Sequence, residues 1–586
     1  MSTPNSASEW WRSAVIYQVY IRSFADSDGD GLGDINGIRS RLPHLVDLGV
    51  DAIWINPWYP SPMADAGYDV SNYRDVEPRF GTLAEAQCLI DEAHALGLRV
   101  LLDIVPNHTS DRHPWFVEAL TAGSRPEGVG RPGEHQSAAA EHSPNMTAGS
   151  RPEARARYLF AEGRGEDGEQ APNNWRSAFG GPAWTRAMKS DGTPGQWYLH
   201  LFAPEQPDLN WNNPEVRTEF ESILRFWFDR GVDGFRIDVA HSLTKQDGLP
   251  DVGQRPVDPA DEWRDHPHWD RDDVHAIYRS WRTLANSYNP PRVFVAEAWV
   301  EQPHRLARYL RPDELHTAFN FDYLRAPWLA APLQAAIEAT LVQHAAVGAP
   351  PTWVLSNHDV ARHPSRYSRV QTINPPFTLD GLLGHPANFE LGLKRARAAA
   401  LLTLALPGSA YIYQGEELGL FEVEDLPDSV LQDPTWLRSG HTQRGRDGCR
   451  VPIPWSGTQS PFGFSPPNAS SPPWLPQPGS WGEVSADALG TEPDSMLSLY
   501  RAALRIRRTH NGLGDGPMGW VDMPTGALAF ERDHGFVCIV NLSTAPVVVP
   551  PRSKILLASG PLSVNGAIPS DVALWVQRIG PDAPTS

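Results

Sequence analysis

The stretch Gly231-Val-Asp-Gly-Phe-Arg-Ile-Asp-Val-Ala-His241 decides how this chain folds. Side chains of a β-strand alternate between its two faces, so Arg236 and Asp238 share one side of an otherwise apolar strand. Such a charged pair has two explanations. It is a buried salt bridge with matched partners, or a carboxylate held ionised so that it can attack or stabilise a cation. This stretch alone does not choose between them.

Three other apolar runs also lead to an acid. Leu98-Arg-Val-Leu-Leu-Asp103 and Val293-Phe-Val-Ala-Glu297 each close on a carboxylate, and Asp359 follows Thr352-Trp-Val-Leu-Ser-Asn-His358. In a barrel of parallel strands the carboxyl ends of all strands lie on one face, where active sites are built. The repetition therefore favours a functional site over scattered surface acids.

These segments resemble the motifs of the α-amylase family of glycoside hydrolases, in the same order along the chain. The four are Asp103-Ile-Val-Pro-Asn-His108, Gly234-Phe-Arg-Ile-Asp-Val-Ala-His241, Glu297-Ala-Trp299 and Ser356-Asn-His-Asp359. A fifth, Gln206-Pro-Asp-Leu-Asn210, is similar to the motif of the oligo-1,6-glucosidase and α-glucosidase branch. The likeness runs over nearly the whole chain, and it implies a barrel of the (β/α)8 type.

The order of expected elements agrees with an α/β fold, a (β/α)8 TIM barrel with an inserted domain after strand 3 and a C-terminal antiparallel β domain. Eight strand-like runs, with helical segments between them, begin at Val15, Ala52, Leu98, Val232, Val293, His316, Thr352 and Ser409. The third and fourth runs are separated by a stretch rich in Gly, Pro and Ser that is too long for an ordinary loop. We assign 1–108 and 198–510 to the catalytic barrel, 109–197 to the inserted domain B, and 511–586 to the C-terminal β domain.

Composition narrows the possible partners. The 586 residues, 41% hydrophobic and 20% charged, suit a large globular enzyme with appended modules. A net charge of −20 argues against nucleic acid and against an anionic membrane surface, because both require a concentrated basic face. A neutral substrate fits better.

The sequence also predicts a location. No run approaches the roughly 20 apolar residues that span a bilayer, and the first residues lack the basic and apolar regions of a secretory signal. Three cysteines, Cys88, Cys449 and Cys538, imply no disulfide framework. We expect a cytoplasmic protein, and its oligomeric state is left open.

The segment Asp26-Ser-Asp-Gly-Asp-Gly-Leu-Gly-Asp34, here called the acidic loop, has the composition of a site for a hard cation. An acidic surface turn is the alternative. The family resemblance implies structural Ca²⁺, with ligands from Asp26, Asp28, Asp30, Asp34 and the carbonyl of Leu32. No organic cofactor is expected.

The resemblance also implies the catalytic roles. Asp238 would be the nucleophile, Glu297 the general acid/base, and Asp359 the carboxylate that binds sugar hydroxyls. The neighbours agree with this, because Arg236 would keep Asp238 ionised and an apolar setting would favour protonated Glu297. Asp103 is expected to orient Arg236.

The resemblance further implies a set of substrate-binding residues, which are Asp65, Tyr68, His108, Arg236, His358 and Arg450. Asp65 and Tyr68 would form the closed end of the pocket. Arg450, in Gly445-Arg-Asp-Gly-Cys-Arg450, would contact the sugar in the deepest subsite. The alternatives are an Asx-type turn at Asp65, ordinary packing of the histidines, and a surface arginine.

The function expected is a retaining, exo-acting α-glucosidase on short malto- or isomalto-oligosaccharides. An α-glucosyl transferase or a sucrose or maltose isomerase of the same branch is the alternative, since one covalent intermediate serves water and sugar acceptors. A non-catalytic, transporter-associated relative and a sugar-binding module are disfavoured because all three acids are present. Val239 resembles α-1,6-acting members and other surroundings resemble α-1,4-acting ones, so the linkage stays open, with α-1,4 favoured.

Overall fold

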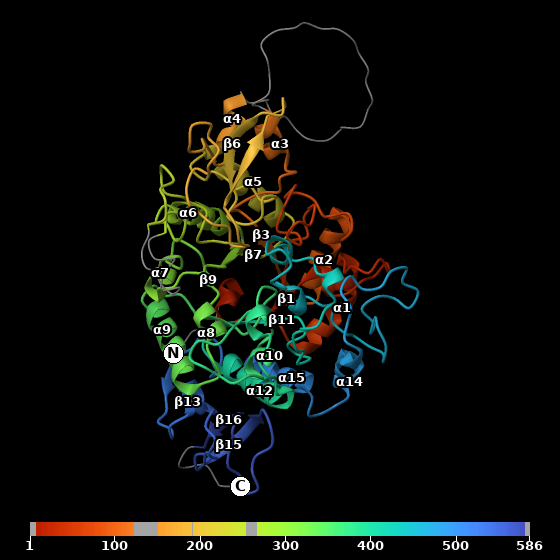
Figure 1. Cartoon of the computed structure of the whole chain (residues 1–586). Helices are drawn as coiled ribbons and strands as arrows, with labels where there is room; N and C mark the ends of the chain where they lie inside the picture. Colours follow the sequence, from red (N-terminus) through yellow and green to blue (C-terminus); the bar gives the residue numbers. More distant parts are fainter. Residues whose placement is uncertain (1–6, 122–150, 190, 254–265, 580–586) are drawn as a thin grey trace.

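The computed structural model of the chain describes residues 7–121, 151–189, 191–253 and 266–579 (Figure 1). Its centre is a sheet of eight parallel strands in the order β10-β11-β1-β2-β3-β7-β8-β9. Their bounds are β1 Val15–Val19, β2 Ala52–Ile55, β3 Arg99–Ile104, β7 Gly234–Ile237, β8 Val293–Ala296, β9 Thr317–Ala318, β10 Thr352–Val354 and β11 Ser409–Tyr413. The predicted barrel fold is therefore confirmed.

The strands are apolar along almost their whole length because both of their faces are covered. Side chains such as Ile16, Trp54, Val295 and Tyr411 form one buried cluster inside the barrel. The alternate residues, such as Ile53, belong to the larger core between the sheet and its helices. This double burial explains why the strand-like runs could be recognised from sequence.

The barrel has a weak point, here called the seam, between β9 and β10. Strand β9 pairs with β8 at only two positions, Val295 with Thr317 and Ala296 with Ala318. Within the described residues no ladder joins β9 to β10, and one backbone bond, from Asn320 N–H to the Thr352 carbonyl (3.3 Å), links the two sides. The eight strands thus form a nearly closed barrel.

Several of the helices start at recognisable capping residues. Asp34 caps α1 through the N–H of Gly37, and Thr82 and Glu85 form a capping box at the start of α2. Asn213, followed by Pro214, opens α5. The main barrel helices are α1 Ile35–Leu48, α2 Leu83–Ala95, α5 Pro214–Phe228, α6 Val274–Asn286, α9 Ala330–Ala345, α12 Phe389–Ala405 and α15 Met496–Thr509. The shorter α7 Pro303–Arg308, α8 Phe321–Arg325 and α10 His363–Tyr367 lie in the connections.

The insert after β3 carries its own small antiparallel sheet in the order β4-β6-β5. It comprises α3 Pro114–Thr121, α4 Arg151–Ala156, β4 Phe160–Ala161, β5 Trp184–Met188 and β6 Pro194–Leu199. Figure 1 shows it projecting from one side of the barrel. Strand β6 runs two residues past the predicted boundary at 197, and residues 122–150 and 190 lie outside the described residues.

The C-terminal part is a five-stranded antiparallel sheet in the order β12-β13-β14-β16-β15. Its strands are β12 Met518–Trp520, β13 Ala527–Arg532, β14 Phe536–Asn541, β15 Ser553–Ala558 and β16 Val572–Arg578. It packs against α12, where the indole N–H of Trp575 donates to the Leu401 carbonyl (3.0 Å). It lies at the end of the molecule opposite the insert (Figure 1).

Two further predictions can be compared with the structure. Cys88, Cys449 and Cys538 are all free thiols, as the odd and small number of cysteines indicated. Among the described residues, no helix is both long and apolar enough to cross a membrane.

Candidate active site

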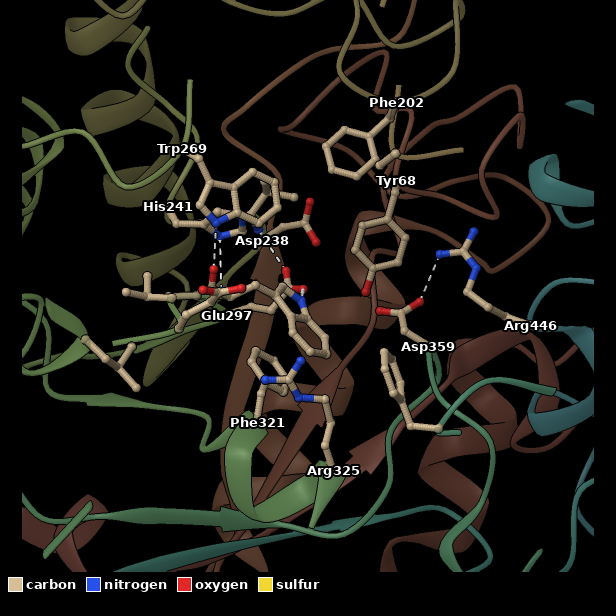
Figure 2. Close-up of a pocket in the computed structure, with 18 of the residues that line it drawn as sticks. Tyr68, Phe202, Asp238, His241, Trp269, Glu297, Phe321, Arg325, Asp359 and Arg446 are labelled. Carbon is tan, nitrogen blue, oxygen red and sulfur yellow. Dashed lines mark hydrogen bonds and ion pairs between the residues drawn. The ribbon is translucent and has the colours of Figure 1, made fainter. Parts of the chain in front are cut away.

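The loops that follow the barrel strands surround a cavity of about 450 Å³. Asp238 directly follows β7, Glu297 directly follows β8, and Asp359 lies in the connection after β10. All three carboxylates line this cavity, and Figure 2 shows them facing the same space. Residues 59 and 62 positions apart along the chain therefore meet because the carboxyl ends of parallel strands share one face.

Arg236 is the cation at the floor of this site. Its Nη1 contacts Asp238 Oδ1 at 2.6 Å and Asp103 Oδ1 at 2.7 Å, and its Nη2 contacts Glu297 Oε2 at 2.9 Å. Asp103 and Arg236 are paired residues on the neighbouring strands β3 and β7. The orienting contact expected between Asp103 and Arg236 is thus present.

Three carboxyl groups share this one guanidinium, which changes the electrostatics predicted from sequence. Burial raises the pKa of Asp238 well above its usual range, Arg236 opposes the rise, and the charges of Glu297 and Asp103 add to it. Burial likewise raises the pKa of Asp103 to about 6. The contact of Arg236 with Glu297 was not predicted, and it adds a third carboxyl to the expected group of Asp103, Arg236 and Asp238. The cluster as a whole retains a proton more readily than isolated carboxylates do.

Glu297 does not lie in the apolar setting that its alanine neighbours suggested. Besides Arg236, its Oε2 accepts the backbone N–H of Val239 (2.8 Å), and its Oε1 accepts the indole N–H of Trp299 (2.8 Å). Val239 reaches Oε2 from a left-handed backbone conformation with φ of 47°, which is strained for a β-branched residue. That prediction is corrected because backbone and side-chain donors from β7 and β8 converge on the carboxyl.

Asp359 is held by positive and polar groups. Its Oδ1 contacts Arg446 Nη1 at 2.9 Å and Arg450 Nη2 at 3.0 Å, and its Oδ2 lies 3.3 Å from His358 Nε2. Burial acts to raise the pKa of Asp359, but His358, Arg446 and Arg450 together move it well below its usual range. Asp359 is therefore an anion throughout the neutral range.

Arg446 closes the end of the cavity on the side of Asp65. Its Nη2 contacts Asp65 Oδ1 at 2.7 Å and its Nε contacts Asp433 Oδ2 at 2.6 Å, in addition to the bond to Asp359. Gln206 Nε2 donates to the other oxygen of Asp65 at 3.2 Å. The loops after β2, β10 and β11 and the end of the insert are thus joined by charged and polar side chains.

Tyr68 connects this end to the floor. Its hydroxyl donates to Asp103 Oδ2 (2.9 Å) and accepts from His358 Nε2 (2.7 Å), while the two rings stack at 5.3 Å. Gln18 donates to His358 Nδ1, which fixes the Nε2–H tautomer. Burial lowers the pKa of His108 to about 4, so this histidine is neutral and its Nε2–H donates to the Tyr68 carbonyl (3.0 Å).

The outer part of the cavity is walled by aromatic rings, here called the aromatic rim. Its members are Phe179, Phe202, Trp269, Trp299, Phe321 and Phe377. Phe202 lies over His108 at 5.3 Å, and Trp299 stacks on Phe321 with ring centroids 3.7 Å apart and planes within 2°. Apolar ring faces with polar groups at the far end suit a pyranose, whose faces are apolar and whose rim carries hydroxyls.

The six predicted substrate-binding residues divide into two sets. Asp65, Tyr68 and His108 line the cavity. Arg236, His358 and Arg450 are only 1–2% exposed and lie behind the lining residues. The position of Arg450 corrects its prediction as a direct sugar contact, because its Nε donates to the His358 carbonyl (2.8 Å) and Arg446 occupies the cavity wall instead.

Sequence reasoning missed several residues of the site. Arg446 lies four positions before Arg450 in the same segment. The available signal was that this segment contains two arginines, either of which could reach the cavity. Gln206 opens a motif that was used only to assign the branch. The aromatic rim comes from five separate connections without periodicity, so no local pattern could have brought these rings together.

The acidic loop contains one group of carboxylates that fits a hard cation. Oxygens of Asp26, Asp28 and Asp34 lie within 4.8 Å of one another. Asp30 is not in this group, and its Oδ1 accepts the N–H of Leu32 (2.8 Å). An all-oxygen donor set of three acids suits Ca²⁺ or Mg²⁺ better than a transition metal.

Comparison with known proteins gives a consistent result. The chain is 38% identical over 553 residues to a probable alpha-glucosidase of Rhizobium meliloti, covering 91% of this chain and 90% of that protein. It is 32% identical to the oligo-1,6-glucosidase of Parageobacillus thermoglucosidasius, covering 86% and 84%. The solved structure of the alpha-glucosyl transfer enzyme XgtA superposes with a TM-score of 0.79 at 34% identity, over 97% and 99% of the two chains. The family described as "Alpha amylase, catalytic domain" matches residues 18–516, and the chain belongs to this family.

Proposed function

We propose that this protein is a retaining, exo-acting α-glucosidase that releases the non-reducing terminal glucosyl unit of short α-linked oligosaccharides. One observation carries the proposal: Asp238, Glu297 and Asp359 line a single cavity whose end is closed by the bond between Arg446 and Asp65. A closed end admits a chain terminus and excludes an internal segment. Membership of the alpha-amylase family and relatives named as glucosidases support the reaction class.

We assign a role to each carboxyl in two displacement steps. Glu297 gives its proton to the glycosidic oxygen while Asp238 attacks the anomeric carbon, so that the bond to the leaving group breaks as the glucosyl ester forms. Oδ1 of Asp238 is engaged by Arg236, which leaves Oδ2 for the attack. Glu297, now ionised, then takes a proton from water as the water oxygen displaces Asp238. Asp359 and Arg446 bind hydroxyls of the sugar.

Retention makes a testable statement about the product. The glucose first released from maltose should be the α-anomer, followed by mutarotation, in a proton NMR time course. An initial β-anomer would contradict double displacement. In a complex with substrate, the carboxyls of Asp238 and Glu297 should lie about 5–5.5 Å apart, because an inverting enzyme needs about 6.5–9.5 Å.

The nucleophile is tested by Asp238→Asn. Hydrolysis should fall by about 10⁴-fold or more, since the amide cannot form the ester. The matched control is D229N, at an exposed aspartate that ends α5 and bonds Tyr288. Equal activity of the two variants would rule out the assignment.

The transferase or isomerase alternative is kept because the same glucosyl ester reacts with sugar acceptors. The relative XgtA is named as an alpha-glucosyl transfer enzyme. Product chromatography with maltose, isomaltose, sucrose and trehalose separates the cases and also reveals the preferred linkage. Free glucose as the main product supports hydrolysis, whereas new disaccharides or isomerised sucrose support the alternative.

We also propose that the acidic loop binds a structural Ca²⁺ through Asp26, Asp28 and Asp34. The ion would offset most of the negative charge of three clustered carboxylates at the start of α1. Removal of divalent cations with EDTA should lower the thermal unfolding midpoint by several degrees, and Ca²⁺ should restore it. D28N should lose this response and D30N should keep it. An unchanged midpoint in EDTA would exclude the ion.

The remaining properties stay predictions from the sequence. A neutral α-linked oligosaccharide as substrate agrees with the net charge of −20 and with the mixed polar and aromatic cavity. A cytoplasmic location agrees with three unpaired cysteines. Fractionation of the producing cells, with activity measured in each fraction, tests the location.

A further inference from the structure

Glu297 carries an incomplete set of hydrogen-bond donors. An ionised carboxyl offers about four acceptor positions, two on each oxygen. Oε2 forms an ion pair with Arg236 Nη2 (2.9 Å) and accepts the Val239 N–H, and Oε1 accepts the Trp299 indole N–H. Among the described residues there is no fourth donor, so one position remains, and it is on Oε1.

This count determines where the transferable proton resides. A proton on Oε2 would displace either the guanidinium or the backbone N–H, and both are fixed in the structure. A proton on Oε1 fills the remaining position and leaves the three bonds in place. Its direction is then set by Trp299, because the indole N–H already occupies the other position on the same oxygen.

Trp299 is itself held in one orientation. Its indole ring stacks flat on Phe321. The guanidinium carbon of Arg325 lies 5.8 Å from the centroid of the same indole ring. Its backbone is fixed by two bonds, from its own N–H to His241 Nδ1 (3.3 Å) and from Trp269 Nε1 to its carbonyl (2.7 Å). Figure 2 shows His241, Trp269 and Phe321 gathered around Glu297.

We propose that Trp299 is a positioning residue for Glu297, whose indole N–H directs the proton on Oε1 toward the oxygen of the leaving group. The inference rests on the proposed function and deepens it. It predicts that Trp299 matters for the step in which the leaving group must be protonated, and not for sugar binding as such. In the return step the same oxygen receives the proton of the attacking water.

The test compares Trp299→Phe with the parent on two α-glucosides. Phenylalanine keeps a ring against Phe321 and removes the N–H. For maltose, whose leaving group needs a proton, kcat/KM should fall about tenfold, in keeping with the loss of one hydrogen bond in the transition state. For a 2,4-dinitrophenyl α-glucoside, whose leaving group departs without a proton, kcat/KM should change less than about twofold.

The pH profile provides a second readout. A hydrogen bond to the ionised form of an acid favours ionisation, so its removal disfavours ionisation. The alkaline limb of kcat/KM, which reports the essential acid of the free enzyme, should move to higher pH by about half a unit to one unit in W299F. A merely structural role would lower the rate without moving this limb.

Two further variants separate the N–H from the shape of the ring. Incorporation of 3-benzothienylalanine at position 299 keeps the bicyclic shape and replaces the N–H by sulfur, and it should reproduce W299F. F202L removes a ring from the same rim at a position whose ring contacts are with His108 and Phe179 and not with Trp299 or Glu297, and it should alter both substrates equally. Equal losses on both substrates in W299F, with an unmoved alkaline limb, would overturn the inference. A parent protein inactive on every α-glucoside would instead refute the proposed function.

Discussion

Arg446 is the single residue on which the closed end of the cavity depends. It bonds Asp65, Asp359 and Asp433, which come from three different connections of the barrel. Its guanidinium also lies over the ring of Phe179 in the insert, at 5.0 Å. Because a planar fork can serve several carboxylates at once, a lysine at this position could not replace it.

Replacement of Arg446 by Gln should lower kcat/KM for maltose by about 10- to 100-fold, because charge-assisted hydrogen bonds of about 1.5–3 kcal/mol are lost. Since Arg446 helps to lower the pKa of Asp359, this carboxyl should protonate at higher pH in the variant. Loss of this positive charge also leaves the other carboxyls of the cavity less compensated, so the acid limb of the kcat/KM profile should move upward in pH.

The matched control for this experiment is R438Q. Arg438 also joins the insert to the same connection, through the Gly180 carbonyl, but does not line the cavity. It should retain nearly full activity and the parental profile. R446K should fall between R446Q and the parent. An R446Q profile identical to that of the parent would show that the charge of Arg446 does not act on the carboxyls of the cavity.

At the scale of elements, the insert is attached to the barrel by a buried lysine. Lys245 Nζ contacts Asp208 Oδ2 (2.8 Å), Asn107 Oδ1 (2.9 Å) and the Ser242 carbonyl (2.7 Å). Burial lowers the pKa of Lys245, although Asp208 opposes this. The ammonium ties the last residues of the insert to the connections after β3 and β7, and so it fixes Gln206 next to Asp65.

The variant K245M should be destabilised, because removal of one partner of a buried pair leaves Asp208 uncompensated, at a cost of about 3–5 kcal/mol. We expect the thermal unfolding midpoint to fall by about 3 °C and KM for maltose to rise. K554M, at an exposed lysine of β15, should leave both values unchanged within error. An unaltered midpoint in K245M would show that the pair contributes nothing to the joint.

The elements themselves were largely predictable, and the reasons are local. Each barrel strand is a mainly apolar run, and the capping-box residues Thr82 and Glu85 mark the start of α2. The run predicted to begin at His316 forms only the two-residue strand β9, Thr317–Ala318. The environment of Glu297 was not predictable from its alanine neighbours, since its donors include Arg236 and Val239 from another strand. Contacts between residues of different strands are determined by the closure of the sheet. A short stretch of sequence around Glu297 contains no information about them.

At the scale of the whole molecule, buried neutral histidines should determine acid stability. Burial lowers the pKa of several of them to about 4 or about 3, namely His108, His113, His200, His241 and His344. In the unfolded chain these groups bind protons near pH 6.5. Their contribution to stability is therefore complete above pH 6.5 and is lost as the pH falls toward 4.

His344, which is remote from the cavity and contacts the Pro350 carbonyl (3.2 Å), isolates this effect. The thermal unfolding midpoint of the parent should fall between pH 6.5 and pH 4, and H344Q should fall less, because one proton fewer is taken up. The difference corresponds to about 3 kcal/mol over the window. H385Q, at an exposed histidine, should follow the parent. Parallel curves for H344Q and the parent would contradict this account.

The seam between β9 and β10 indicates where a sugar chain can enter the cavity. Asn320 and Phe321 follow β9 and line the cavity. They are connected to the part of the sheet with the fewest backbone hydrogen bonds. Thermal breathing of a protein concentrates where such bonds are sparse. Local opening of the sheet at the seam would therefore move Phe321 together with the indole of Trp299 that stacks on it, while the charged end built on Arg446 would keep its place. A sugar chain would then enter the cavity beside Glu297 and stop at the end that Arg446 and Asp65 close.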